Sequence, residues 1–243
     1  MKLEICTTSY LSAKNAQKAG ADRIELCAEL AIGGITPSYG LIQQVIENLT
    51  IPIFVLIRPR SGNFTYSKVE FEIMKKDILL CKKLGCSGIV SGVLNKDNSI
   101  DIIRTQELIA LSKPLPFTFH RAFDWTPKPL EALEKLLQIK ADRVLTSGQE
   151  TSATRGINLL IELQKKAKND ICILAGGGIN SKNAQLFKKS GFSEIHASAS
   201  TQKTVNLPPK ISMNSPKFLD ETLLSFSDEH KIEAIIKSIK NEK

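Results

Sequence analysis

The residues best suited to chemistry in this sequence form a short pattern that occurs twice, 21 residues apart. Leu3-Glu4-Ile5-Cys6 is followed by Ile24-Glu25-Leu26-Cys27. Alternate side chains of a β-strand point to opposite faces, so each stretch is predicted to place its aliphatic residues on one face and its glutamate and cysteine on the other. A strand face of carboxylates and thiols indicates the floor of a site rather than a plain hydrophobic core.

Cys6 and Cys27 are candidate metal ligands, because thiolates favour soft ions such as Cu(I). Neighbouring strands lie ~4.8 Å apart, so two thiols on the same face come within reach of one ion. The alternative is that both are packing residues, since cysteine often fills core positions and the strands of a closed barrel are staggered. Glu4 and Glu25 on the same face must be paired or protonated, because an unpaired buried charge is costly.

His120 and His196 are two of the three histidines in the chain. Each follows an apolar residue, Phe119 or Ile195, in a predicted strand, so both rings are expected to face inward. Either histidine could serve as a general acid or base near neutral pH. A hydrogen-bonded structural role is the alternative for both.

Arg58 and Arg60 bracket Pro59 at the end of another predicted strand. An arginine binds a carboxylate or a phosphate through two parallel donors, which makes both residues candidates for holding an anionic ligand. The alternative is that they pair with Glu4 or Glu25 inside the protein.

Three consecutive glycines, Gly176 to Gly178, follow a predicted strand at 171–175, and Ser198 lies in the next predicted strand. Glycines let backbone N–H groups approach an anion, and a helix predicted to start near Asn180 adds its positive end. In many barrels the loops after the last two strands hold a substrate phosphate. The pattern predicts an anion site, and a tight turn that needs glycine for its backbone angles is the alternative.

These residues lie at the ends of short apolar or alternating stretches that predict β-strands at 2–7, 23–27, 52–58, 88–94, 116–121, 143–147, 171–175 and 194–199. Amphipathic stretches between them predict helices near 10–19, 38–48, 67–84, 101–112, 128–138, 152–168 and 181–189. Thr36-Pro37 is expected to begin one helix, and Gly20, Gly85 and Gly191 are expected to follow the ends of others.

Strands that alternate with helices in this way are typical of an α/β fold, the (β/α)8 TIM barrel. A doubly wound open sheet is the alternative, but the regular spacing without a linker counts against it. We predict one domain over residues 1–243, with the barrel strands within 1–200 and a C-terminal loop and helix in 201–243. Because barrel sites form where strands end, the polar residues above are expected to share one pocket.

The net charge of +8 does not indicate nucleic-acid binding, because the lysines are scattered and the sequence has no compact arginine-rich run or RNA-binding aromatic motif. No stretch approaches the ~20 apolar residues that span a membrane. The chain begins with a charged strand rather than an apolar secretory segment. Five cysteines without an export signal are expected to be free thiols, which predicts a cytoplasmic protein.

Several segments together resemble the CutC family of copper-homeostasis proteins: GADRIELC (20–27), GGITPS (33–38), IRPRSGNFTYS (57–67), TFHRAFD (118–124), RVLTSG (143–148), AGGGI (175–179) and EIHASA (194–199). The resemblance implies a single TIM barrel, a cytoplasmic location and self-association as homodimers or homotetramers. It also implies that Cys6 and Cys27 bind copper. The family's polar pocket corresponds to Glu25, Arg58, Arg60, His120, Arg121, Asp124 and Ser147. The chain departs from the family at Ser61-Gly62-Asn63, where Gly-Gly-Asp is common, and beyond residue 200.

The sequence therefore leads to one functional hypothesis and one alternative to it. The first is a cytoplasmic copper-homeostasis protein that binds Cu(I) through Cys6 and Cys27. The second is an enzyme that acts on a small phosphorylated or carboxylated metabolite. In that hypothesis, the catalytic candidates are Glu25, His120 and Arg58, and the anion-binding candidates are Arg60, Gly176, Gly177, Gly178 and Ser198. The expected partner is a copper ion or a small anionic ligand, not nucleic acid or a membrane.

Overall fold

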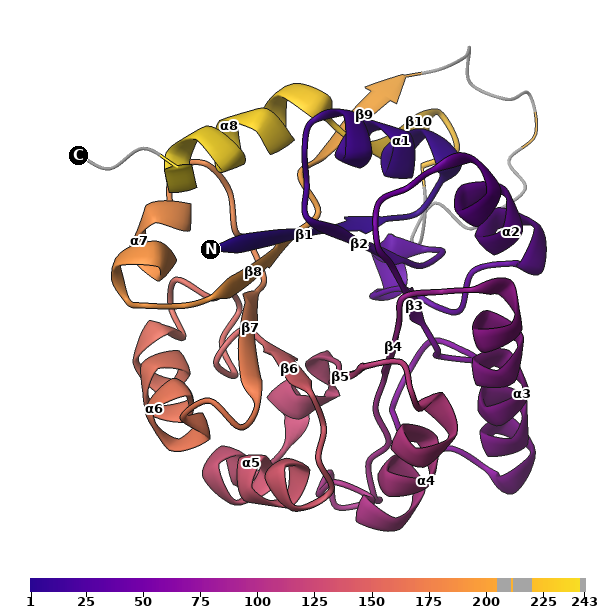
Figure 1. Ribbon diagram of the computed structural model, residues 1–243, viewed down its shortest axis with the longest axis vertical. Coiled ribbons are helices and arrows are strands. Elements are labelled where there is room, and N and C mark those ends of the chain that lie inside the picture. Colours follow the sequence, from indigo (N-terminus) through magenta and orange to yellow (C-terminus); the bar gives the residue numbers. More distant parts are fainter. Residues whose placement is uncertain (205–210, 212–219, 241–243) are drawn as a thin grey trace.

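Parallel strands close into a barrel in the computed structural model, which describes residues 1–204, 211 and 220–240 (Figure 1). Each strand pairs with the next in sequence, and the last pairs with the first, with Lys2 opposite Glu194. The strands are β1 (Lys2–Thr7), β2 (Arg23–Leu26), β3 (Ile53–Leu56), β4 (Gly88–Ser91), β5 (Phe117–Phe119), β6 (Arg143–Thr146), β7 (Cys172–Gly176) and β8 (Glu194–Ala197). The predicted TIM barrel is confirmed, and the open-sheet alternative is wrong.

Helices form a ring around this barrel, and α8 closes the ring between α7 and α1 (Figure 1). They are α1 (Tyr10–Lys18), α2 (Tyr39–Asn48), α3 (Lys68–Leu84), α4 (Ile102–Ser112), α5 (Pro129–Gln138), α6 (Ile157–Ala167), α7 (Ala184–Lys189) and α8 (Glu229–Lys240). Within the part of the chain that the structure describes, no helix is long and apolar enough to cross a membrane.

The helix ends follow from local hydrogen bonding. Ser67 and Glu70 form a reciprocal capping box at the start of α3. Gly85 ends the same helix with a φ of 89°, and Gly20 and Gly191 also follow helix ends with positive φ, as predicted. The predicted cap at Thr36 is wrong. Ser38 caps α2, whereas the Thr36 hydroxyl accepts a hydrogen bond from the backbone N–H of Arg58, two residues after β3 ends.

Strand alternation divides the buried side chains into two layers. Leu3 and Ile5, together with aliphatic residues of the other strands, pack outward against the helices. A separate buried apolar cluster contains both cysteines of the repeated pattern: Cys6, Cys27, Phe54, Leu56 and Val90. The polar strand face therefore lies inside the barrel, as the repeated pattern predicts.

The C-terminal segment contains an antiparallel strand pair that the sequence does not predict, β9 (Ser200–Thr204) with β10 (Leu223–Ser227). Ser227 ties this pair to the barrel, because its hydroxyl donates to the backbone carbonyl of Cys6 and its N–H donates to Ser12 on α1. The helix predicted within 201–243 is present as α8. Part of the predicted loop, at 205–210 and 212–219, lies outside the described residues.

Candidate metal and ligand site

A cavity of about 310 Å³ opens where several barrel strands end. It collects most of the predicted site residues from separate strands: Cys6, Glu25, Cys27, Arg58, His120, Arg121, Gly177, Gly178, His196 and Ser198. Arg60 and Gly176 are not among its lining residues. Four of these residues meet on one wall: Cys6 from β1, Glu25 from β2, Cys27 directly after β2, and His196 from β8.

The two thiols lie together, with Cys6 Sγ 3.5 Å from Cys27 Sγ. In the register of β1 and β2, Cys6 is opposite Glu25, so Cys27 lies two residues beyond the position opposite Cys6. The two sulfurs are in contact despite this offset between the strands. The contact with Cys27 and burial both raise the pKa of Cys6 well above its ordinary value, because two thiolates cannot share this site without a cation.

A buried ion network lies beneath the thiols. Arg23 on β2 donates hydrogen bonds to Glu4 and, at 2.6 Å, to Glu194, which also accepts from Arg143 at 3.0 Å. Burial alone would raise the pKa of Glu4. The hydrogen bond from His196 and the positive charge of Arg23 outweigh burial and hold this pKa at about 2. Glu4 is therefore ionised at neutral pH.

His196 lies between two carboxylates. Its Nδ1 is 2.8 Å from Glu4 Oε1, and its Nε2 is 3.6 Å from Glu25 Oε2. Burial would lower the pKa of His196, but the hydrogen bond to Glu4 and the negative charges on both sides raise it. For Glu25, burial is the largest effect and raises its pKa, despite the opposing charge of His196. The Cys6 thiol, Glu25 and His196 bring their ligand atoms within 4.8 Å of one another.

Neither Arg58 nor Arg60 pairs with Glu4 or Glu25. Arg58 is buried, and its guanidinium donates to the backbone carbonyls of Ile32, Gly34 and Gly62. Its Nε has no hydrogen-bond partner among the described residues. The partner of Glu4 is Arg23 instead. The strand alternation that places Glu25 inside the barrel also places Arg23 there, so this signal was present in the sequence.

Arg60 lies outside the cavity, on the loop that follows β3. Its guanidinium pairs with Glu70 at the start of α3 at 2.5 Å and donates to the carbonyls of Asn63 and Thr65. These bonds hold the loop in place. Anion binding by Arg60 stays a prediction.

His120 lines the cavity on the wall opposite the thiols, and its ring is uncharged. Burial, followed by the nearby charge of Arg58, lowers its pKa to about 3. Its Nδ1 accepts a hydrogen bond from the backbone N–H of Ala122 at 3.2 Å, so the ring proton is on Nε2. That Nε2 is buried without a partner among the described residues. The arrangement suits a fixed hydrogen-bond donor better than a group that exchanges protons at neutral pH.

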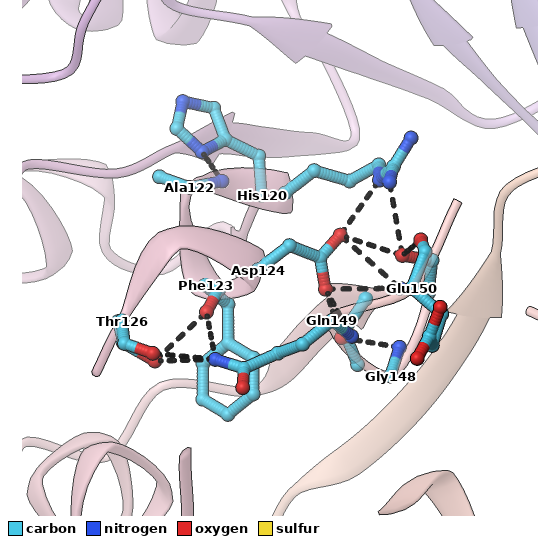
Figure 2. A network of polar contacts seen from close by, with 11 residues as sticks. His120, Ala122, Phe123, Asp124, Thr126, Gly148, Gln149 and Glu150 are labelled. Carbon is cyan, nitrogen blue, oxygen red and sulfur yellow. Dashed lines mark hydrogen bonds and ion pairs between the residues drawn. The ribbon is translucent and has the colours of Figure 1, made fainter. Parts of the chain in front are cut away.

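Asp124, which lies on the 3₁₀ helix Arg121–Trp125, joins the ends of β5 and β6. Its carboxylate accepts from the hydroxyls of Thr146 and Ser147, from two backbone N–H groups and from Arg121 at 2.8 Å. Figure 2 shows this carboxylate at the centre of the network, with the His120 ring turned away from it. Asp124 and Ser147 therefore have a structural role, because their hydrogen bonds connect the segments that follow β5 and β6. The half-exposed Arg121 lines the cavity.

The glycine run forms a tight turn. Gly177 and Gly178 have φ of 112° and 73°, and the Gly178 carbonyl accepts hydrogen bonds from the side chains of Asn180 and Asn183. The helix predicted to start near 180 begins only at Ala184. Both glycines and Ser198 do line the cavity, so an anion site there stays a prediction.

Comparison with known proteins agrees with the fold. The sequence pattern of the CutC family matches residues 1–201. A human protein named copper homeostasis protein cutC homolog is 42% identical over 98% of this chain and 89% of its own length. A family protein CutC from Photorhabdus laumondii is 48% identical over 82% of this chain and 80% of its own length.

A solved structure shows the same architecture. The crystal structure of the putative copper homeostasis protein CutC from Streptococcus agalactiae superposes with a TM-score of 0.77 and 33% sequence identity, and it covers 82% of this chain and 98% of that one. Sequence, fold and the match over residues 1–201 point to the same group of proteins. The chain belongs to the CutC family.

Proposed function

We propose that this protein serves copper homeostasis in the cytoplasm by binding Cu(I) through the thiolates of Cys6 and Cys27. One observation carries the proposal: the two sulfurs lie 3.5 Å apart at the edge of a cavity. Thiolates are the ligands that Cu(I) prefers. The names of the human and S. agalactiae relatives support the link to copper. Free thiols at this separation also suit the reducing cytoplasm.

The sulfur separation limits the coordination geometry. Two sulfurs 3.5 Å apart lie within reach of one ion with metal–sulfur bonds of ~2.3 Å, so the thiolates of Cys6 and Cys27 would hold it together. A linear two-coordinate ion needs a separation of ~4.6 Å, which side-chain rotation of about 1 Å would supply. Both thiols must lose their protons, so binding Cu(I) releases protons.

A titration of Cu(I) against a competing chelator tests this proposal. Wild type should bind one ion per chain, whereas Cys6→Ser and Cys27→Ser should each lose most of that affinity, because a single thiolate remains. Cys172→Ser is the matched control, since this thiol lies beside Ser193 and outside the cavity lining. Equal affinity in all four proteins would refute the two-thiol site.

The cavity also supports a second candidate, an enzyme for a small phosphorylated or carboxylated metabolite. A volume of about 310 Å³ exceeds what one ion occupies, and His120 Nε2 and Arg58 Nε are buried donors without partners among the described residues. Glu25, with its raised pKa, is the candidate base in that reaction. Crystals grown with phosphate test this candidate: we expect an ordered anion at Gly177 and Ser198, and an empty loop at high phosphate would contradict it.

A further inference from the structure

We propose that Cys6, Glu25 and His196 form a second metal site, for a divalent ion such as Zn²⁺, that shares Cys6 with the thiol pair. This site uses a different ion and two ligands that the Cu(I) proposal does not need. It does not require Cys27, so it stands or fails separately from the Cu(I) proposal.

The ligand atoms of the three donors already lie close together. Their ligand atoms lie within 4.8 Å of one another, and His196 Nε2 is 3.6 Å from Glu25 Oε2. Ligands of a tetrahedral zinc ion, with bonds of ~2.0–2.3 Å, are separated by roughly 3.5 Å. Side-chain rotations of about 1 Å would therefore complete the site without backbone movement. Among the described residues, no other group of three such donors is this close.

The orientation of His196 is the most specific feature. Glu4 Oε1 accepts from Nδ1 at 2.8 Å, which directs the other ring nitrogen, Nε2, toward Glu25. A carboxylate behind a histidine is the arrangement that fixes metal-binding imidazoles in proteins. Glu4 is itself fixed by Arg23, and Arg23 is held by Glu194. The supporting residues of a metal site are thus present along with its ligands.

Charge and ligand type favour a divalent ion of intermediate softness. Thiolate, imidazole and carboxylate are the ligands of protein zinc sites. The Cys6 thiolate and the Glu25 carboxylate together neutralise a double positive charge, which a buried site requires. All three residues line the cavity, so a fourth position faces open space, as in catalytic zinc sites.

The test uses Zn²⁺ in competition with a chromophoric chelator, and Co²⁺ as a spectroscopic substitute, on the chain of residues 1–243. Cys27→Ser removes the thiol pair and keeps all three donors, so it should bind Zn²⁺ like wild type and keep the near-ultraviolet thiolate–Co²⁺ absorption. Cys6→Ser should lose that absorption and most of the affinity. His196→Gln and Glu25→Gln should each weaken Zn²⁺ binding by at least about tenfold.

Circular dichroism and thermal unfolding show whether each variant is folded. If either the His196 or the Glu25 variant does not fold, the other still tests the proposal. Cu(I) binding should survive His196→Gln and be lost in Cys27→Ser, the reverse of the Zn²⁺ result. The proposal is overturned if wild type takes up no Zn²⁺. It is also overturned if Cys27→Ser loses Zn²⁺ as completely as Cys6→Ser, because the divalent ion would then use the thiol pair.

Discussion

Replacing Glu4 by glutamine tests the ion network that supports the site. Glu4 is 2% exposed and pairs with Arg23 and His196. Its pKa of about 2 lies some 2.5 units below the ordinary value of 4.5, and each unit corresponds to ~1.4 kcal/mol. We therefore expect Glu4→Gln to lower the free energy of unfolding at pH 7 by about 3 kcal/mol, which agrees with ~3–5 kcal/mol for breaking a buried ion pair.

The same argument fixes a pH dependence. Because the pKa of Glu4 is lowered in the folded protein, its contribution is fully present above the unfolded pKa of 4.5 and is lost as the pH falls toward 2. Wild type should thus lose about 3 kcal/mol from this group between pH 5 and pH 2. The difference between wild type and Glu4→Gln should shrink over the same range.

Chemical denaturation at several pH values measures both effects. Glu70→Gln is the matched control, since it removes a carboxylate that pairs with Arg60 at the surface and should cost no more than about 1 kcal/mol. A Glu4→Gln variant as stable as wild type at pH 7 would refute the reasoning. So would a difference between the two proteins that stays constant from pH 5 to pH 2.

Two further predictions concern the scaffold, and urea denaturation measures both. Gly156→Ala should lower the free energy of unfolding by about 1–3 kcal/mol or more, because the added Cβ would lie 2.0 Å from the Ser147 carbonyl oxygen. Gly40→Ala is the control, since the space at that position is open and the substitution should not destabilise the protein. Ser67→Ala should cost about 1 kcal/mol, because it removes half of the capping box with Glu70, and an unchanged stability would contradict that role.

The barrel could be predicted because its strands carry a strong period-2 signal and its helices an amphipathic one. The ends of strands were less predictable. β5 stops at Phe119, two residues before the predicted end, because the His120 side chain caps the 3₁₀ helix that follows. β9 was missed, since Ser200–Thr204 is polar throughout and shows no apolar alternation. One domain over 1–243, self-association and a cytoplasmic location stay predictions.

The site could be predicted as a set of inward-facing residues, but not as a set of pairs. Alternation placed Glu4, Glu25 and both cysteines inside the barrel. It could not show that Cys6 contacts Cys27 despite the two-residue offset between them in the register of β1 and β2, because this contact depends on side-chain rotation. Nor could it show that Arg58 would bind backbone carbonyls, since those belong to loops without a periodic pattern.

The most direct test of the copper proposal locates the ion. Crystals of the reduced protein loaded with one equivalent of Cu(I) should show an anomalous peak at the copper edge between Cys6 Sγ and Cys27 Sγ, within ~2.3 Å of both sulfurs. The peak should vanish in Cys27→Ser crystals prepared in the same way. Copper bound elsewhere in the wild-type protein, with the two thiols unoccupied, would contradict the proposal.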